Sequence, residues 1–369
     1  MKICHITKKY PNQLGGDVVV VSALQAYQEK AGHQLIVITS RSKEIKTGAA
    51  IYNVGLKDTG EGLDKITLKR LFSLCILSLR AFFIFIKERP AIVHTHSIDM
   101  AFAVAGAAHL LRVPLVHTFH IVTFYDKQQS VMRRWVELHL VRLARPTVIT
   151  TPNRHDAAML QQAGLKQAVY VPNGVDIDFW QPVADSSRND SFTFISVGRL
   201  EPQKGYEYLI KAAALLKKSI HKSFQVIIVG EGAQRRQLQS LIRSLKATDV
   251  VQLVGRKTAV QTRRLLSAAD VAVFASLYET TPLTLLEAWA MGLPVIMTPV
   301  GILHDAPLDT KKVFLVPKKD EQALMQAMRR SIENQAQCTT IAAAGQAEAR
   351  QYSWLEVNCR YEKLYGSVL

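Results

Sequence analysis

The sequence predicts an α/β fold with two doubly wound domains in series, each a parallel sheet covered by helices on both faces. Three observations predict it. The chain has 369 residues, which is more than one hydrophobic core usually serves and enough for two domains. Short β-branched runs alternate with longer helical stretches, as is typical of parallel sheets. The alternation stops at a polar segment and then restarts, which indicates a domain boundary.

The first half of the chain contains six apolar runs that we expect to be strands, with five helical stretches between them. The strands are expected at 2–7, 35–40, 91–97, 114–120, 147–152 and 168–175, and the helices near 17–31, 65–88, 99–111, 130–144 and 153–163. The helix at 65–88 contains an apolar run interrupted by Arg80. A membrane span needs about 20 apolar residues, so a packed or interfacial helix is predicted instead.

The second half repeats the pattern after the polar segment. Strands are expected at 192–198, 225–232, 250–255, 271–276, 294–299 and 313–317, and helices near 204–218, 233–246, 259–268, 283–291 and 320–334. These elements predict domains at 1–175 and 192–350, with a linker at 176–191. The tail at 351–369 has aromatic residues at helical spacing and predicts a helix that crosses back to the first domain, although a simple capping helix is equally consistent.

Composition restricts the class of protein. Hydrophobic residues make up 48% and charged residues 21% of the chain, which argues against disorder, collagen-like repeats and a bundle of membrane spans. The four cysteines show no C-x-x-C spacing, so they predict neither a disulfide framework nor a zinc knuckle. The apolar run at the start is too short for a signal peptide, and the expected location is the cytoplasm.

The net charge is +16, and the first 170 residues hold 22 Lys and Arg against 11 Asp and Glu. Such a field attracts anions of several classes. No helix-turn-helix, zinc-finger or RNA-binding aromatic pattern accompanies it, so nucleic acid is not an expected partner. The basic, apolar segment at 65–88 leaves an anionic membrane surface open as a partner, with peripheral binding to the inner face of the membrane.

Candidate binding residues follow the strands of the second half. Arg199 comes directly after a strand and Lys204 begins the next predicted helix. In open parallel sheets, ligands bind beyond the carboxyl ends of the strands. The two cations therefore predict a shared anion, for which a diphosphate is well suited; exposed surface cations are the plain alternative.

The segment YETTPLTLLEAWAMGLPVI carries the clearest helix start. Thr281 is predicted as the N-cap and Pro282 as the first helical residue, with Gly292 ending the helix. Glu279 then precedes the helix and Glu287 lies inside it. The helix N-terminus, with Thr281 and Leu283, carries about +0.5 charge and would favour a departing diphosphate without a metal. Glu287 could accept hydrogen bonds from ribose hydroxyls, or simply pair with a cation on its own helix.

Glycine turns suggest further donor contacts. The turn that contains Gly230 and Gly232 lacks the third glycine of the dinucleotide motif, which argues against NAD. Lys257 follows the next strand, where backbone groups could meet a base edge. In the first half, Gly15 and Gly16 open a helix with exposed N–H groups suited to phosphate, although a loop that needs positive φ is the plain alternative.

Histidines gather on two predicted strands of the first half. His94 and His96 alternate and therefore face one side, while His117 and His120 lie on the next strand. Zinc is conceivable, but no Asp, Glu or Cys cluster accompanies them, so buried, hydrogen-bonded histidines are expected and no metal is predicted. His120 ends its strand and should reach the ligand.

In their order and spacing, these motifs resemble the retaining glycosyltransferases of family 4, which have the GT-B fold. The resemblance rests on Gly15-Gly16, HTHS, TFH ending at His120, PNGVD, VGRLEPQKG, and Glu279 with Glu287 eight positions later. It implies a nucleotide-sugar donor mainly on the second domain and a hydroxyl acceptor mainly on the first. It also implies that no metal or other cofactor is needed.

The resemblance further implies individual roles. Arg199 and Lys204 would hold the diphosphate, Glu287 the ribose, Glu279 and His120 the donor sugar, and the Gly16 amide the donor phosphate. The family pattern departs after Glu279, where Thr280-Thr281-Pro282 replaces a glycine-rich stretch, and at 300–305, VGILHD. These departures leave the sugar and acceptor open.

The expected function is transfer of a hexosyl unit from a UDP- or GDP-sugar to a glycan, glycolipid or small molecule, as in cell-envelope polysaccharide or glycolipid synthesis. Two alternatives remain: a nucleotide-sugar 2-epimerase of the same fold, and a non-catalytic scaffold that binds a membrane or a partner.

Overall fold

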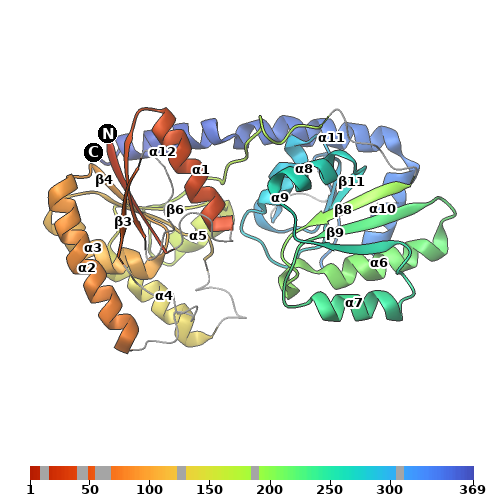
Figure 1. Ribbon diagram of the computed structural model, residues 1–369, viewed down its shortest axis with the longest axis horizontal. Helices are drawn as coiled ribbons and strands as arrows, with labels where there is room; N and C mark the ends of the chain where they lie inside the picture. The colour runs from red at the N-terminus through yellow and green to blue at the C-terminus, as the bar shows by residue number, and fades with distance from the viewer. Residues whose placement is uncertain (9–15, 40–48, 55–67, 123–129, 184–190, 305–310) are drawn as a thin grey trace. The chain divides into compact units, whose positions relative to one another are not determined.

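The computed structural model describes residues 1–8, 16–39, 49–54, 68–122, 130–183, 191–304 and 311–369. Within these residues the chain forms two compact units (Figure 1). The first unit comprises residues 1–173 together with 354–369, and the second comprises residues 174–353. Each contains one parallel sheet between helices, so the α/β class predicted from the alternating pattern is confirmed.

The first unit is built on a sheet in the order β3-β2-β1-β4-β5-β6-β7, with every pair parallel. Its strands are β1 (Lys2–Thr7), β2 (Gln34–Thr39), β3 (Ala50–Asn53), β4 (Ile92–Thr95), β5 (Leu115–Thr118), β6 (Val148–Thr151) and β7 (Ala168–Tyr170). Its helices are α1 (Gly16–Lys30), α2 (Leu68–Glu88), α3 (Ile98–Leu110), α4 (Val131–Ala144), α5 (Arg154–Gln162) and, from the end of the chain, α12 (Trp354–Gly366).

The second unit is built on a sheet in the order β10-β9-β8-β11-β12-β13, again parallel. Its strands are β8 (Phe192–Val197), β9 (Phe224–Val229), β10 (Val251–Gly255), β11 (Val271–Phe274), β12 (Val295–Met297) and β13 (Phe314–Leu315). Its helices are α6 (Tyr206–Ser219), α7 (Arg235–Ser244), α8 (Ala259–Ser267), α9 (Leu283–Ala290), α10 (Glu321–Glu333) and α11 (Gln335–Ala349), with short 3-10 turns at Pro202–Lys204, Gly301–Leu303 and Arg350–Tyr352.

Two elements were not expected from the sequence. Strand β3 has four residues, all at least partly exposed, so it lacks the apolar run that marks a buried strand. Helix α11 is rich in Ala, Gln and Thr, and its buried residues, such as Cys338 and Ile341, are few. Its apolar residues do not form a clear stripe, so helical periodicity does not detect it.

The segment expected to be a linker packs in part on the second unit. Trp180 is buried there among the core residues of that unit, and its amide donates to the carbonyl of Asp176. The Arg263 guanidinium lies over the ring of Phe179. Residues 184–190 of the expected linker lie outside the described residues.

Helix α12 returns to the first unit, where it packs against α1. Tyr361 and Tyr365 are buried on its inner face. Together α1 and α12 cover one face of the sheet, whereas α2 and α3 cover the other, where Cys4, Ile6 and Val93 contribute to the core. Polar side chains that project from the α1–α12 face are therefore enclosed between the sheet and two helices.

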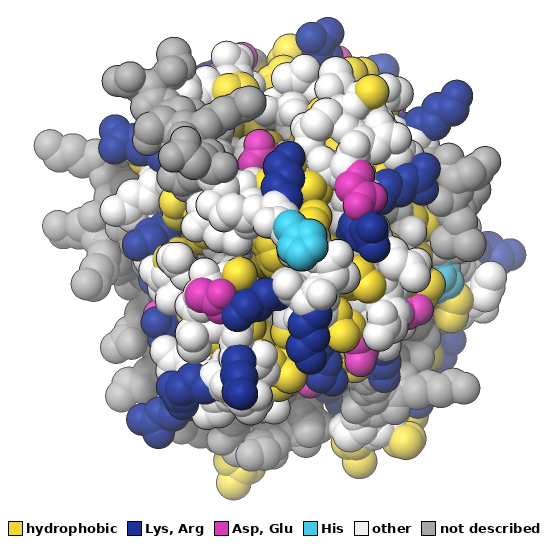
Figure 2. Space-filling model, turned by 90° about the vertical axis from the view of Figure 1, so that its right-hand side faces the viewer, with side chains coloured by type: hydrophobic (Ala, Val, Ile, Leu, Met, Phe, Trp, Pro, Cys, Tyr) yellow, Lys and Arg dark blue, Asp and Glu magenta, His cyan; other side chains and the backbone are white. Residues whose placement is uncertain are grey.

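The surface charge of the second unit is dispersed on the face shown in Figure 2. The Lys and Arg side chains that Figure 2 shows are interspersed with acidic, apolar and neutral groups. Among the helices of the described ranges, none combines the length and hydropathy needed to cross a membrane.

Candidate functional site

The candidate site of the second unit lies where its strand order reverses. The chain runs outward from β8 to β9 and β10, then returns to place β11 on the other side of β8. The carboxyl ends of two such neighbouring strands form a crevice in open α/β sheets. Arg199 and Lys204 follow β8, and Glu279 follows β11. The topology therefore brings these sequence-predicted residues to one end of one sheet.

A close backbone approach joins the two loops. Gly205 has φ +63°, and a Cβ atom built there would lie 2.0 Å from the carbonyl oxygen of Ala275. The amide of Leu277 also donates to the carbonyl of Gln203 at 2.7 Å. Only glycine fits this position, because a side chain would force the loops apart. The loop that carries Lys204 is thereby held against the loop that carries Glu279.

Lys204 and Glu279 form an ion pair in which both side chains are mostly buried. Lys204 Nζ donates to Glu279 Oε1, and Ser276 Oγ donates to the same oxygen at 3.1 Å. The lysine stem lies against the end of β8, since its Cε is 3.3 Å from a Cβ built on Gly198. Lys204 ends a 3-10 turn instead of starting the next helix as expected, because Gly205 must turn the chain before α6 begins.

Helix α9 supplies the second carboxylate, although its start differs from the prediction. Pro282 has ψ 111°, an extended value, so it precedes the helix, and Leu283 is the first helical residue. Thr281 is therefore not the N-cap; it is buried in the preceding loop. A Cβ on Gly301 would lie 2.8 Å from Pro282 Cδ, so Pro282 packs closely against the next loop.

The end of α9 agrees with the prediction. Gly292 adopts φ +68°, and its amide donates to the carbonyl of Trp289, while the amide of Leu293 donates to that of Ala288. This is the Schellman arrangement, which satisfies the last carbonyls of a helix. With both ends in place, Glu287 lies in the second turn of α9.

Glu287 is partly buried, and Lys204 influences the pKa of its carboxyl. Burial raises the pKa of the Glu287 carboxyl to about 7, and the nearby Lys204 ammonium opposes the rise. A carboxyl with such a pKa can take up or release a proton near neutral pH. Lys204 thus lies within electrostatic range of both Glu279 and Glu287, and the structure brings the three predicted charges together.

The other predicted residues of the second unit are two cations at strand ends and two glycines that pack against backbone. Arg199 lies at the end of β8 with an exposed side chain, and Lys257 follows β10 and is partly exposed. The predicted glycines have a packing role: a Cβ on Gly230 would meet the carbonyl oxygen of Gly198 at 1.8 Å, and one on Gly232 would meet that of Leu200 at 2.4 Å. Convergence of Arg199 with Lys204 remains a prediction.

Two polar groups of this site were not identified from the sequence. Ser276 donates to Glu279, and Tyr206, at the start of α6, hydrogen bonds Ser196. Burial and the nearby Glu279 carboxylate raise the pKa of Tyr206. The position of Ser276 directly after a strand was an available signal. The Tyr206 hydroxyl lies close to Gly198, where a side chain would clash with it. Nothing in the sequence around Tyr206 indicates this contact.

The first unit holds the remaining predicted residues. Gly16 is the first residue of α1, whereas Gly15 lies outside the described residues. His120 follows β5, and its Nε2 lies 3.2 Å from Nδ1 of His96. His94 and His96 lie on one face of β4, as expected, while His117 lies across from Thr95 on the opposite face. The expectation of buried, hydrogen-bonded histidines is confirmed for His94 and His117.

A protein with two Rossmann-like units and this pair of loops is of the class that binds nucleotides at the ends of parallel strands. Comparison with known families refines the class. The model of the glycosyl transferases group 1 matches residues 181–348, and that of glycosyltransferase family 4 matches residues 14–179. The chain belongs to the family 4 glycosyltransferases and is a glycosyltransferase of group 1 type.

Relatives and solved structures agree with this assignment. The chain is 28% identical over 285 residues to glycogen synthase of Mycobacterium tuberculosis, covering 75% of this chain and 69% of that protein. It is 24% identical over 377 residues to the GPI3 subunit of a phosphatidylinositol N-acetylglucosaminyltransferase of Saccharomyces cerevisiae, covering 97% and 81%. Among solved structures, sucrose-phosphate synthase from Thermosynechococcus elongatus superposes with a TM-score of 0.83 at 22% identity, covering 100% and 98%.

A second structural neighbour is Anabaena HepE in complex with UDP, with a TM-score of 0.80 at 19% identity and full coverage of both chains. At these identities the structural likeness establishes the fold, which is GT-B as the sequence motifs predicted.

Proposed function

We propose that the chain transfers a hexosyl unit, with retention of configuration, from a UDP- or GDP-linked sugar to a hydroxyl of a glycan, glycolipid or small molecule. The observation that carries the proposal is the group formed by Lys204, Glu279 and Glu287 at the reversal of strand order in the second unit. A diphosphate supplies the negative charge that Lys204 is placed to meet, and UDP is bound by one structural neighbour, Anabaena HepE.

The geometry supports distinct roles for the three groups. In the structure Lys204 pairs with Glu279. An arriving diphosphate would share this ammonium, which frees Glu279 to accept hydrogen bonds from sugar hydroxyls. Glu287, further along α9, would accept hydrogen bonds from the ribose. Arg199 and the amide-rich start of α9 add positive potential where charge develops on the leaving group.

The reaction is then a substitution at the anomeric carbon. The bond from this carbon to the diphosphate oxygen breaks, and the acceptor oxygen forms a new bond on the same face. The acceptor proton passes to the departing diphosphate, so no separate base is required opposite the leaving group. The proposal therefore needs neither the pair of carboxylates that glycosidases use nor a metal or other cofactor.

A panel of nucleotides tests the donor. We expect UDP or GDP to raise the Tm of the protein by about 2–4 °C at a concentration near 100 times Kd, because selective binding at that ratio stabilises a protein by about 2.7 kcal/mol. ADP serves as the comparison. The preferred nucleotide, linked to glucose or mannose, should be hydrolysed slowly without acceptor, and EDTA should not change the rate.

Two results would contradict the proposal. If no nucleoside diphosphate shifts Tm at millimolar concentration, the donor site is not where we place it. If a nucleotide sugar is converted to its 2-epimer without transfer or hydrolysis, the chain is the epimerase of the same fold. The configuration of the transferred sugar, measured from its anomeric proton coupling, decides between retention and inversion.

The acceptor side of the proposal concerns the outer face of α2. Six apolar side chains at helical spacing are close to half exposed or more: Leu68, Leu71, Phe72, Leu79, Phe83 and Ile86. Arg80 and Lys87 are exposed on the same helix. An amphipathic helix with apolar and basic groups binds the interface of an anionic bilayer. We propose that this surface docks the chain on anionic lipid, where lipid-linked acceptors reside.

Flotation with liposomes tests this docking. The wild-type chain is expected to float with vesicles that contain about 30% phosphatidylglycerol, and to float much less with neutral vesicles. A Phe72→Ser, Phe83→Ser variant should lose most of the binding, while a Leu355→Ser variant, changed at an exposed apolar residue of α12, should retain it. Equal flotation of all three proteins, or none at any anionic lipid content, would contradict the proposal.

A further inference from the structure

Exposed apolar side chains concentrate on three helices of the first unit. Within the described residues, most of the large hydrophobic side chains that are exposed lie on α2, α3 and α4, and a single one, Val260, lies in the second unit. Apolar residues scattered singly over a surface are ordinary, whereas a concentration of them indicates an interaction site. Six lie on α2, as described above, and the others are Phe102, Leu110, Val131, Met132, Trp135 and Leu143.

The three helices form one layer, because α3 packs against both α2 and α4. Figure 1 shows them together on one side of the sheet of the first unit. On α2 the buried residues Leu77, Ala81 and Phe85 recur at helical spacing and face the core, so the exposed ones face outward. On α4 the exposed residues Val131 and Trp135 likewise lie one helical turn apart. The exposed residues of α2, α3 and α4 are here called the outer face.

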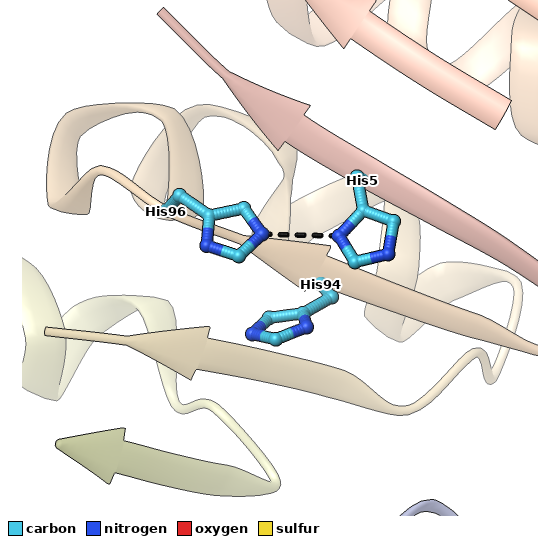
Figure 3. A group of neighbouring side chains, drawn as sticks. All are labelled: His5, His94 and His96. Carbon is cyan, nitrogen blue, oxygen red and sulfur yellow. Dashed lines mark hydrogen bonds between the residues drawn. The ribbon is translucent and has the colours of Figure 1, made fainter. Parts of the chain in front are cut away.

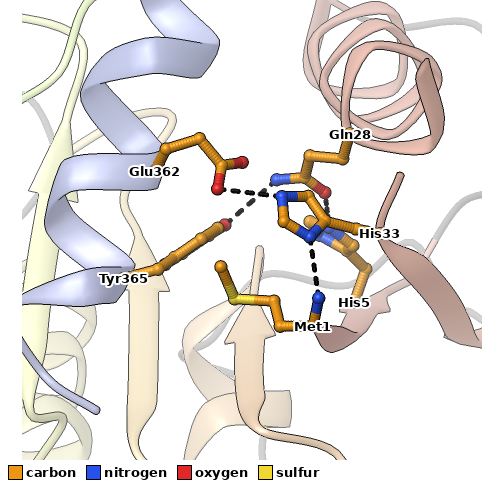
Figure 4. Close-up of polar contacts among 6 residues, drawn as sticks. All are labelled: Met1, His5, Gln28, His33, Glu362 and Tyr365. Atoms are coloured by element: carbon orange, nitrogen blue, oxygen red, sulfur yellow. Dashed lines mark hydrogen bonds and ion pairs between the residues drawn. The ribbon is translucent and has the colours of Figure 1, made fainter. Parts of the chain in front are cut away.

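The opposite side of this sheet is already covered by α1 and α12. Gln28 of α1 donates to the Tyr365 hydroxyl of α12 at 3.3 Å (Figure 4). Beneath the two helices lie His5, His94 and His96, with His5 Nδ1 3.0 Å from His96 Nε2 (Figure 3). The outer face is therefore the side of the sheet on which the helix layer presents its apolar residues to solvent.

An arginine follows each of the three helices at the same position. Arg89, Arg112 and Arg145 each lie three residues before the first residue of the next strand, which is β4, β5 and β6 respectively. These strands are parallel neighbours, so the arginines form a row along one margin of the layer. Each has a positive φ, of 49°, 54° and 45°, which glycine usually supplies at a helix end.

The guanidinium groups of this arginine row are available to a ligand. All three residues are exposed, and in the described ranges their side chains form no hydrogen bond or ion pair. A cation at the end of a helix is favoured by the helix dipole, so the position stabilises the helix and leaves the guanidinium group open. An exposed aliphatic side chain precedes each arginine by two or three residues: Ile86, Leu110 and Leu143.

The exposed charges of the layer have one sign. Among the described residues of 68–122 and 130–145, the acidic ones are Glu88, Asp99 and Glu137, and none of them is exposed. Glu88 pairs with Lys2, and Asp99 pairs with Lys8. A basic, apolar surface is complementary to an anionic bilayer. A second copy of the same surface would instead bring like charges together, which is unfavourable.

We propose that the whole outer face docks on an anionic bilayer, with the arginine row bound to lipid phosphates and Trp135 at the membrane interface. The inference extends the docking proposed for α2 and rests on it. Guanidinium groups form forked hydrogen bonds with phosphate oxygens. The aliphatic side chains beside them enter the apolar side of the interface. Tryptophan is favoured there because its ring is apolar and its N–H group is polar.

Trp135 reports on α4 directly. Its side chain is 57% exposed, whereas Trp180, Trp289 and Trp354 are 8%, 1% and 4% exposed. On addition of vesicles that contain about 30% phosphatidylglycerol, we expect tryptophan emission to shift to shorter wavelength. Lipids brominated on the acyl chain should quench it. A Trp135→Phe variant should still float with the vesicles but show neither the shift nor the quenching.

Removal of the arginine row tests headgroup binding. The variant Arg89→Gln, Arg112→Gln, Arg145→Gln is expected to partition about 100-fold less onto the same vesicles, because each cation near an anionic surface contributes several-fold. The matched control is Arg243→Gln, Lys246→Gln, Lys319→Gln, which removes the same charge from exposed positions of the second unit. Lys246 and Lys319 share the positive φ, at 54° and 60°. The control should bind as the wild type does.

Three results would overturn the inference. Equal partitioning of the arginine variant and its control would show that net charge alone acts. Flotation of the wild type with unchanged Trp135 emission would show that α2 docks by itself. A lipid-independent dimer that shields Trp135, with no flotation, would assign the outer face to a second copy of the chain.

These failures can be told apart from failure of the proposed function. If the Phe72→Ser, Phe83→Ser variant loses flotation while Trp135 and the arginine row have no effect, the docking of α2 stands and only the extension fails. If the wild type does not float at all, both fail. Nucleotide binding is measured without lipid, so the transferase proposal is tested separately.

Discussion

Replacing Lys204 by Met is expected to lower kcat/KM for the nucleotide sugar by about 10²–10³-fold, the usual cost of removing one group that stabilises developing charge. The structure gives the reason: this ammonium is held by Glu279 at the end of β8 and interacts electrostatically with Glu287. Methionine retains the aliphatic stem that packs at Gly198. Steady-state kinetics and calorimetric titration of the nucleoside diphosphate measure the effect.

The matched control is Lys217→Met. Lys217 also forms an ion pair, with Asp249 at 2.7 Å, but on an exposed surface of the same unit. Its removal is expected to leave kcat/KM within about twofold of the wild type, since exposed pairs contribute little. An equal loss in both variants, or unchanged kcat/KM in Lys204→Met with its fold intact, would show that Lys204 is a structural cation only.

The affinity for the nucleoside diphosphate is expected to rise about tenfold between pH 6 and pH 8, beyond any change due to the phosphate itself. The pKa of Glu287 in the free protein is about 7, and we propose that its ionised form accepts hydrogen bonds from the ribose. Binding then favours loss of the proton, so affinity increases as the pH rises through this pKa. Titration calorimetry at several pH values measures the slope.

Glu287→Gln separates the contribution of Glu287 from that of the phosphate. In the variant, the pH dependence of the affinity should keep the part that comes from the ligand phosphate and lose the part that comes from Glu287.

The stability of the protein provides a second check on Glu287. The folded-state pKa of Glu287 lies above its ordinary value of 4.5, so stability due to this group is present below pH 4.5 and is lost as the pH rises toward 7. Glu287→Gln should therefore gain stability relative to the wild type at pH 8 but not at pH 4.

Identical pH slopes for the wild type and Glu287→Gln would contradict the ribose role. They would indicate that Glu287 acts within the protein, for example by supporting the packing of α9.

Local physics explains which parts of the site were predictable. Glu287 could be placed in α9 because Gly292 and the proline after it mark the end of the helix in the sequence. The start was misplaced by one residue, because Pro282 has an extended ψ and stays outside the helix. Pro282 also packs closely against Gly301, a contact between loops that helix-capping preferences do not contain. Lys204 was expected beside a shared anion, whereas its partner in the structure is Glu279, 75 positions away.

The histidines of the first unit show the same division. The alternation of His94 and His96 along one strand predicts that they share a face, since strand geometry has a period of two residues. Their partnership with His5, Gln28 and Tyr365 depends on the strand register and on the return of α12, which are long-range features.

The α/β class, the order of the strands and helices other than β3 and α11, and the identity of the charged residues after β8 and β11 were determined by the sequence alone, because hydrophobic period, turn chemistry and spacing are local properties of the chain. The tertiary structure decided which of these residues meet: it paired Lys204 with Glu279, raised the pKa of Glu287 and brought Tyr365 to His94. The physical reason is that burial, electrostatics and hydrogen-bond direction depend on neighbours distant in sequence, which only strand order and close backbone approach bring together.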